Sequence, residues 1–191
     1  DNLSPNQGEK IVCGTLPAYS EVWILYPDKR DGLECSRYVA MRWDEGHWTN
    51  GTFGRSSWVS PGIFEYPILF GVDGKIYFHE IGASAVGGPI DWFSESAYFD
   101  IGDGENIMFL RRIVGDFDDL QGPVTFTVYG RMWPTGAESV YGPYLHNTQT
   151  NKIDLLVSAR QIKLRIGGNA APAFARLGAL RLDLVETGAR Q

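Results

Sequence analysis

The sequence predicts an all-β protein, in which antiparallel propeller-blade-like sheets are followed by a β-sandwich. Three observations lead to this prediction. Short apolar runs of strand length recur along the 191 residues and are separated by Gly, Pro and Asp. Aromatic residues make up 13% of the chain, which also contains 23 Gly and 10 Pro. Patterns typical of helices are nearly absent, because the one alanine-rich segment, residues 169–175, is interrupted by Pro172 and is predicted to be a loop.

The first half contains apolar runs joined by tight turns. These runs are residues 21–26, 37–43, 66–71 and 75–80. The Asp73-Gly74 pair between the last two is a strong hairpin signal. In the second run Val39, Met41 and Trp43 share one face, which we expect to be buried. The two repeated units resemble propeller blades, spaced by roughly 40–45 residues. Two blades cannot close a ring, so we expect either further blades upstream of the chain or an open stack.

A segment of small residues, 83–89, is predicted to join two domains. This places a propeller-blade-like β region at 1–88 and a β-sandwich domain at 89–191. Six further runs follow the segment, at residues 91–99, 108–115, 124–131, 153–158, 161–166 and 177–185. Their number and alternation suit a sandwich of the jelly-roll or immunoglobulin-like type. Two rows are predicted to face the core: Val124, Phe126 and Val128, and Leu180, Leu182 and Leu184.

The net charge of −6 argues against tight binding to the phosphate backbone of nucleic acids, because such binding needs clustered Lys and Arg. Acidic residues gather in 91–121, and basic residues predominate from Lys152 onward. Such opposed regions suit a self-associating subunit, although ordinary mixing of surface charge explains them equally well. No apolar run reaches the eighteen residues that a membrane-spanning helix requires, so no membrane insertion is expected.

Motifs for catalysis or for a cofactor are not found. The three histidines are dispersed, so we expect no metal site, and the acidic turn at residues 100–106 lacks the spacing of an EF-hand. Asp116, Asp118 and Asp119 are neighbours on one predicted loop, whereas glycoside hydrolysis needs carboxylates that face each other across a cleft. Cys13 and Cys35 are predicted to be free, buried thiols, with a single disulfide between them as the alternative.

Several aromatic residues could stack on sugars or on another subunit, namely Trp43, Trp48, Trp58, Tyr66, Trp92 and Trp133. Packing between sheets is the favoured interpretation, because tryptophans in blades commonly fill that space. Trp133 differs from the others, since it follows a strand end among turn residues. A contact with another subunit is an equal alternative there.

The order of short motifs along the chain resembles a known family. The motifs are Glu21–Pro27, Arg37–Val39, Trp48 with Gly51, Asp73-Gly74 with His79-Glu80, Asp100–Gly104, Arg111–Ile113, Asp116-Phe117, Arg160-Gln161, Leu164–Ile166, Arg176–Gly178 and Arg181–Asp183. This order is similar to that of the C-terminal portion of tail hub or nozzle proteins of short-tailed bacteriophages, also called DNA-stabilisation proteins. Two positions depart from the family pattern: Ala159 stands where a Gly is usual, and Ala175 where a Trp is usual.

The resemblance implies a non-enzymatic structural component of the virion tail, assembled in the host cytoplasm. Such a subunit forms a ring with copies of itself, contacts other tail and portal-adaptor proteins, and helps to retain genomic DNA, which passes through the lumen without specific binding. No cofactor and no metal are expected. The candidate interface residues are Arg111, Arg112, Asp116, Asp118, Asp119, Trp133, Arg160 and Arg176.

Two other classes of function remain open from the sequence. One is a lectin-like, carbohydrate-binding module of a tail or secreted protein that uses Trp92, Trp133 or Tyr144 as a stacking platform. The other is a glycosidase or depolymerase, for which the sequence does not single out a facing pair of carboxylates.

Overall fold

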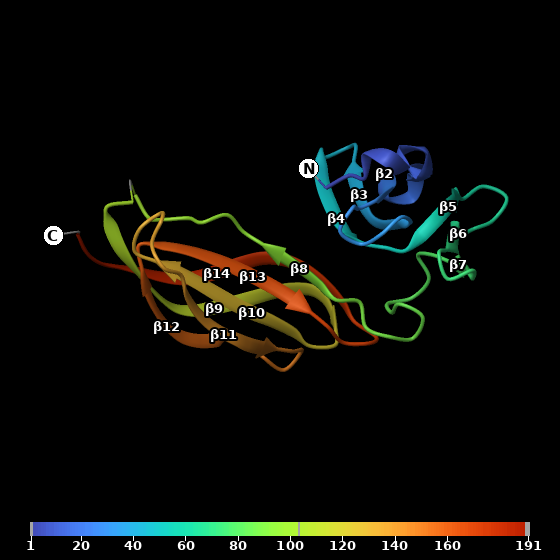
Figure 1. Cartoon of the computed structure of the whole chain (residues 1–191). Coiled ribbons are helices and arrows are strands. Elements are labelled where there is room, and N and C mark those ends of the chain that lie inside the picture. Colours follow the sequence, from blue (N-terminus) through green and yellow to red (C-terminus); the bar gives the residue numbers. More distant parts are fainter. Residues whose placement is uncertain (1, 103, 190–191) are drawn as a thin grey trace. The chain divides into compact units, whose positions relative to one another are not determined.

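The computed structural model describes residues 2–102 and 104–189, and nearly all of its regular structure is β-strand (Figure 1). The described residues form fourteen strands and two short 3-10 helices, Pro5–Lys10 and Pro17–Tyr19. The prediction of an all-β protein is therefore confirmed. Within the described part of the chain, no helix is long and apolar enough to cross a membrane.

The chain divides into two compact units, Asp1–Ile81 and Gly82–Gln191. The division falls earlier than the sequence-based boundary between residues 88 and 89. The segment expected to link the domains belongs to the second unit, because the backbone N–H of Ala173 donates a hydrogen bond to the carbonyl of Ala83 (3.1 Å). Ala85 and Gly88 also bridge to each other, which folds this segment back on itself.

Unit 1 contains two antiparallel sheets whose strands follow one another in chain order. The first sheet consists of β1 (Val12–Leu16), β2 (Glu21–Pro27), β3 (Cys35–Arg42) and β4 (His47–Thr52). The second consists of β5 (Arg55–Val59), β6 (Ile68–Gly71) and β7 (Ile76–Phe78). Propeller blades have the same sequential strand order.

The core of unit 1 lies between these sheets. Leu25, Cys35 and Leu69 are buried at its centre, and Tyr38 and Trp58 pack against them. Both aromatic rings pack directly against glycines, where a larger residue would not fit. A Cβ added to Gly14 would lie only 2.0 Å from the Trp58 indole, and one added to Gly51 only 2.6 Å from the Tyr38 ring.

The predicted inward row of β3 is wrong. Ala40, only 2% exposed, lies on the buried face together with Tyr38, whereas Trp43 is 46% exposed. The register explains the difference. Ala40 is paired with Trp23, so the small side chain leaves room for the indole on the inner face.

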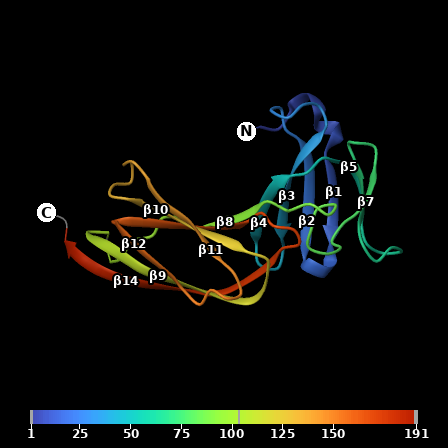
Figure 2. The same cartoon turned by 90° about the horizontal axis from the view of Figure 1, so that it is seen from below.

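Unit 2 contains two sheets that share one core, an arrangement of the sandwich type (Figures 1 and 2). The first sheet has the order β11 (Ser139–His146), β10 (Val124–Arg131), β13 (Gln161–Gly168) and β8 (Trp92–Glu95). The second has the order β12 (Ile153–Ala159), β9 (Asn106–Gln121) and β14 (Phe174–Ala189).

The core of unit 2 is built from alternating rows of both sheets. Val124, Phe126 and Val128 of β10 are at most 2% exposed, so the predicted row is confirmed. The predicted leucine row of β14 also packs against this core, where its members are partly buried: Leu180, Leu182 and Leu184. Burial of these rows is the main stabilising contribution, at about 25 cal/mol per Å² of apolar surface.

Candidate functional site

The charged residues predicted to form an interface lie mainly on β9, where three of them are paired within the sheet. The pairs are Arg111–Asp183 (2.9 Å), Arg112–Asp154 (2.7 Å) and Asp116–Arg181 (3.1 Å). Lys152 and Arg112 also hold the pKa of the Asp154 carboxyl below its usual range. Strand β9 from the acidic stretch therefore lies between β12 and β14 from the basic stretch (Figure 2). The ion pairs between these strands partly neutralise their charges.

Asp118 and Asp119 lie exposed near the end of the same strand. Asp119 is paired in register with Arg176, whose guanidinium lies 5.7 Å from the centre of the Phe174 ring. Because the two acids follow each other along one strand, they do not face each other across a cleft as a glycosidase requires.

Trp133 and Arg160 are brought together although they are distant in the sequence. The guanidinium of Arg160 lies 5.6 Å from the centre of the Trp133 ring and donates a hydrogen bond to the carbonyl of Gly104. Trp133 remains 45% exposed, so this cation–π pair forms part of the surface of unit 2. Asp100, from the acidic turn, accepts a hydrogen bond from the Gln161 amide (3.3 Å).

The acidic turn does not supply a cation site from its described residues. Asp103, one of the acids in this turn, lies outside the described residues. Over residues 2–102 and 104–189, no group of three or more His, Cys, Asp or Glu side chains is arranged to hold a metal ion.

A network of cations, carboxylates and aromatic rings covers the outer face of the β11–β10–β13–β8 sheet. Lys163 lies at its centre, with Nζ 3.1 Å from Glu95, 3.4 Å from Glu138 and 4.3 Å from the centre of the Tyr129 ring. Tyr98 donates a hydrogen bond to Glu138, and Arg131 stacks on Tyr98 at 3.6 Å. These contacts fix the side chains across several strands.

Glu95 and Glu138 are the two acids of this network, and they converge on the one ammonium of Lys163. A glycosidase acid needs a raised pKa so that it can hold a proton at neutral pH. Here the Tyr98 hydroxyl and then the Lys163 ammonium hold the pKa of Glu138 below its usual range, against the opposing effect of burial. Glu138 is therefore suited to an ion pair and not to proton donation.

Next to this network, a groove of about 340 Å³ opens on the same sheet. Its walls include Phe93 and Leu145, which are 59% and 61% exposed, and its polar groups include Asp91, Arg165 and Asn169. Trp92 and Tyr144, two of the predicted stacking platforms, are partly buried against the core, and Trp92 also lines the groove. Phe93 is the ring that is turned outward beside the groove.

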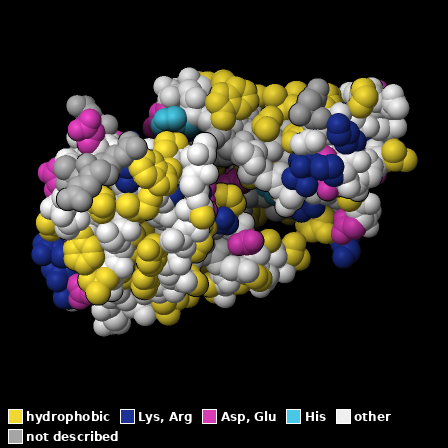
Figure 3. Space-filling view, turned by 60° about the vertical axis from the view of Figure 1, so that its left-hand side comes forward, with side chains coloured by type: hydrophobic (Ala, Val, Ile, Leu, Met, Phe, Trp, Pro, Cys, Tyr) yellow, Lys and Arg dark blue, Asp and Glu magenta, His cyan; other side chains and the backbone are white. Residues whose placement is uncertain are grey.

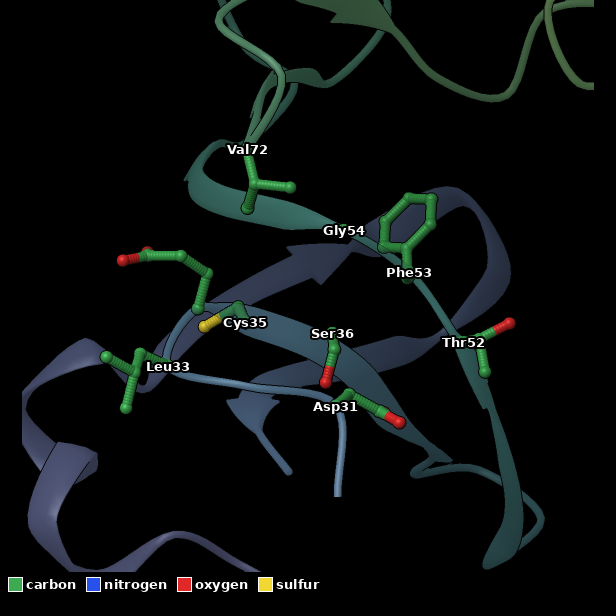
Figure 4. A pocket seen from close by; sticks show the side chains of 9 residues that line it. Asp31, Leu33, Cys35, Ser36, Thr52, Phe53, Gly54 and Val72 are labelled. Atoms are coloured by element: carbon green, nitrogen blue, oxygen red, sulfur yellow. The ribbon is translucent and has the colours of Figure 1, made fainter. Parts of the chain in front are cut away.

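Unit 1 has a hollow of its own, of about 400 Å³, beside Cys35 (Figure 4). Asp31 accepts hydrogen bonds from Arg37 there (2.6 and 3.2 Å), and the Cys35 thiol donates one to the carbonyl of Lys10 (3.0 Å). Burial raises the pKa of this thiol, so at neutral pH it is protonated and a weak nucleophile. Both cysteines are free as predicted, but Cys13 is exposed.

The outer face of the β5–β6–β7 sheet is apolar and exposed. Register places Val59, Ile68 and Phe78 in one row across the sheet, and Ser57, Phe70 and Ile76 in the next, so five of these six side chains are apolar. Phe78 and Ile76 are 60% and 61% exposed. The opposite face carries Trp58 and Leu69, which pack into the core of unit 1. This sheet therefore has two apolar faces, one of them uncovered.

No family model matches the chain, and no curated protein matches it. The candidate surfaces thus rest on the residues themselves. That Trp133 and Arg160 contact another subunit stays a prediction. The apolar face of β5–β6–β7 and the groove beside Phe93 were not predicted from the sequence. The outward row alternates with the inward residues Trp58 and Leu69, and it can be recognised only once the pairing of the three strands is known. Its apolar members are Val59, Ile68, Phe70, Ile76 and Phe78.

Proposed function

We propose that this chain is a non-enzymatic structural subunit of a bacteriophage tail, of the hub or nozzle type. Copies of the subunit associate head to tail into a ring around the DNA exit channel, help to retain packaged DNA, and contact other tail and portal-adaptor proteins. The ordered motifs described above support the family. Unit 1, with its two sheets of sequential strands, is the propeller-blade-like part of the subunit, and unit 2 is the sandwich.

The uncovered apolar face of the β5–β6–β7 sheet is the observation that carries this proposal. Exposed hydrophobic side chains gathered on one flat face are characteristic of protein–protein contacts. A sheet normally buries such a face against another layer. Figure 3 shows one view of the surface, on which hydrophobic side chains lie among charged and other polar ones; the residues of the β5–β6–β7 face are given by their exposure.

A second apolar surface in the same unit favours another copy of the chain as the partner. Trp43 and Trp48, 46% and 62% exposed, lie at and just after the turn between β3 and β4, and β4 is an edge strand of its sheet. A head-to-tail contact needs two different surfaces on each subunit, and a ring results where the rotation closes. The β5–β6–β7 face and the Trp43–Trp48 surface are such a pair.

The charges of the chain suit a passage for DNA that must slide. Tight binding to DNA requires many free Lys and Arg that release counterions from phosphates. Here the net charge is −6, and Arg111, Arg112, Lys163 and Arg181 are paired with carboxylates. We therefore expect contact with DNA in the lumen without tight or sequence-specific binding.

Native mass spectrometry of the purified chain tests the proposal. We expect oligomers of defined stoichiometry for the wild type, and monomers for Phe78→Asp, because a buried carboxylate in the contact is costly. Leu156→Asp is the matched control, since Leu156 is 73% exposed on the other unit and should assemble normally. Monomeric wild type at micromolar concentration, or unchanged assembly of Phe78→Asp, would contradict the proposal.

A further inference from the structure

The groove on unit 2 owes its shape to one glycine in the outer face of the sheet. Register aligns four residues in a row across four strands: Phe93 on β8, Gly167 on β13, Thr125 on β10 and Leu145 on β11. The outer two are large and the inner two are small. Because strands lie about 4.8 Å apart, the row spans about 14 Å between β8 and β11. The result is a slot with apolar walls and a floor of backbone and Thr125.

The wall at Phe93 is held in place. The guanidinium of Arg165 lies 3.7 Å from the centre of the Phe93 ring and 3.9 Å from a carboxylate oxygen of Glu95. One face of the ring is therefore covered by a cation, while the side chain remains 59% exposed. A ring fixed in this way loses little conformational freedom when a ligand packs against it.

Hydrogen-bond donors and acceptors both surround the slot. Thr127 is paired in register with Arg165 and lines one side, and Asp91 and Asn169 line the pocket as well. In the part of the chain that the structure describes, the side chains of Thr127, Asp91 and Asn169 make no hydrogen bond or ion pair, so their donors and acceptors are available. Thr125 is different, because its hydroxyl already donates to the carbonyl of Gly167 (3.2 Å).

We propose that this groove binds a neutral saccharide chain. A pyranose ring presents apolar C–H faces and a rim of hydroxyls that both donate and accept, which matches apolar walls combined with Asp91, Asn169, Thr127 and Arg165. The single carboxylate and the single guanidinium balance, which favours a neutral ligand over an acidic one. The volume of about 340 Å³ lies at the lower end of the range for ligand sites, and it suits a short stretch of the chain.

This inference is independent of the proposed self-association. It concerns unit 2 and a small ligand, whereas the assembly surfaces lie on unit 1. The lectin-like alternative from the sequence named Trp92, Trp133 and Tyr144. In the structure Tyr144 packs against the core and Trp133 lies beside Arg160, whereas Trp92 is partly buried and also lines the groove. Phe93 is the more exposed ring of the groove, at 59%.

Isothermal titration of the full chain with neutral trisaccharides provides the test, with maltotriose, cellotriose, mannotriose and chitotriose as probes. We expect at least one of them to bind. Phe93→Ala and Asp91→Ala should each weaken that binding at least tenfold, because they remove the wall and an acceptor. Phe174→Ala is the matched control: Phe174 is also exposed and also lies beneath an arginine, Arg176, but on the other sheet.

Far-UV circular dichroism and thermal melts of each variant separate lost binding from lost folding. Phe78→Asp should bind the saccharide like the wild type, and Phe93→Ala should assemble like the wild type, so failure of one proposal does not imply failure of the other. The inference is overturned if none of the four probes binds at millimolar concentration, or if folded Phe93→Ala and Asp91→Ala bind as well as the wild type.

Discussion

His146 on β11 is a histidine enclosed by aromatic side chains in the core of unit 2. It is 3% exposed, its ring lies 5.0 Å from Phe117 and 5.7 Å from Phe126, and neither ring nitrogen has a hydrogen-bond partner within the part of the chain that the structure describes. Burial lowers the pKa of the imidazole, so the ring is neutral at physiological pH. An unpartnered polar group in a core costs about 1–3 kcal/mol.

The protonation of His146 predicts an acid-sensitive unit 2. Below about pH 6.5 the unfolded chain takes up a proton that the folded chain resists, so the free energy of unfolding decreases as the pH falls. We expect His146→Leu to remove up to about 1.4 kcal/mol of this loss per pH unit between pH 6.5 and 5.5. Urea unfolding at pH 7.5, 6.5 and 5.5 measures the difference.

His79 provides an internal comparison for that experiment. Burial and then the nearby Arg55 lower the pKa of His79 to about 4. His79 lies in unit 1, so its contribution is present in both proteins and cancels between them. Equal pH dependence of wild type and His146→Leu would show that His146 is not the source of the acid sensitivity.

The inward-facing residues of a strand could be predicted from the sequence for β10 but not for β3. Val124, Phe126 and Val128 were assigned to the core by alternation alone, because β10 is a central strand with one face turned inward. The same logic failed for β3, where Ala40 is the inward residue. Alternation identifies two faces, but the choice between them depends on which partner side chain needs the space.

Among the elements, β9 and β14 are each 16 residues long and pair along most of their length. The predicted runs, 108–115 and 177–185, cover only the apolar middle of these strands. Acidic residues such as Asp116 ended the predicted run, because polar clusters are typical of loops. In the structure Asp116 pairs with Arg181 from the neighbouring strand, and this long-range partner is not visible in local sequence.

Strand β11 was not predicted, and its sequence explains why. Gly142 and Pro143 interrupt the apolar pattern, and proline cannot donate a hydrogen bond to a sheet. In the structure the strand bulges at this point, with Tyr141 paired to Val128 and Tyr144 to Phe126. A bulge on an edge strand tolerates such residues, so only the neighbouring β10 defines β11 as a strand.

The pairing of β9 with β14 yields a prediction about the charge pair Arg111–Asp183. The single reversal Arg111→Asp should lower the free energy of unfolding of unit 2 by less than about 1 kcal/mol, because both side chains are partly exposed. The double variant Arg111→Asp with Asp183→Arg should restore most of the loss, as judged by urea unfolding.

The oligomer masses of the same variants show whether Arg111 also contacts another copy of the chain. We expect unchanged oligomers in native mass spectrometry for both variants, because Arg111 and Asp183 form an ion pair within the sheet. A double variant as unstable as the single one would contradict the pairing, and altered oligomers would show that Arg111 contacts another copy, as the sequence analysis predicts.

At the scale of the whole molecule, each unit carries a distinct set of surfaces. Unit 1 exposes apolar side chains on the β5–β6–β7 face and at Trp43 and Trp48. Unit 2 exposes paired charges on one sheet, and a groove with a network of cations and rings on the other. We propose that unit 1 assembles the ring and that unit 2 presents its outer faces to partners of other kinds.

The most direct test of head-to-tail assembly is a disulfide between two different surfaces of unit 1. In a Cys13→Ser background, Phe78→Cys and Trp48→Cys are made as separate proteins, mixed and oxidised. We expect a disulfide-linked heterodimer in the mixture and little cross-linking within either protein alone, seen by non-reducing electrophoresis. Efficient cross-linking of Phe78→Cys with itself, or none in the mixture, would contradict it.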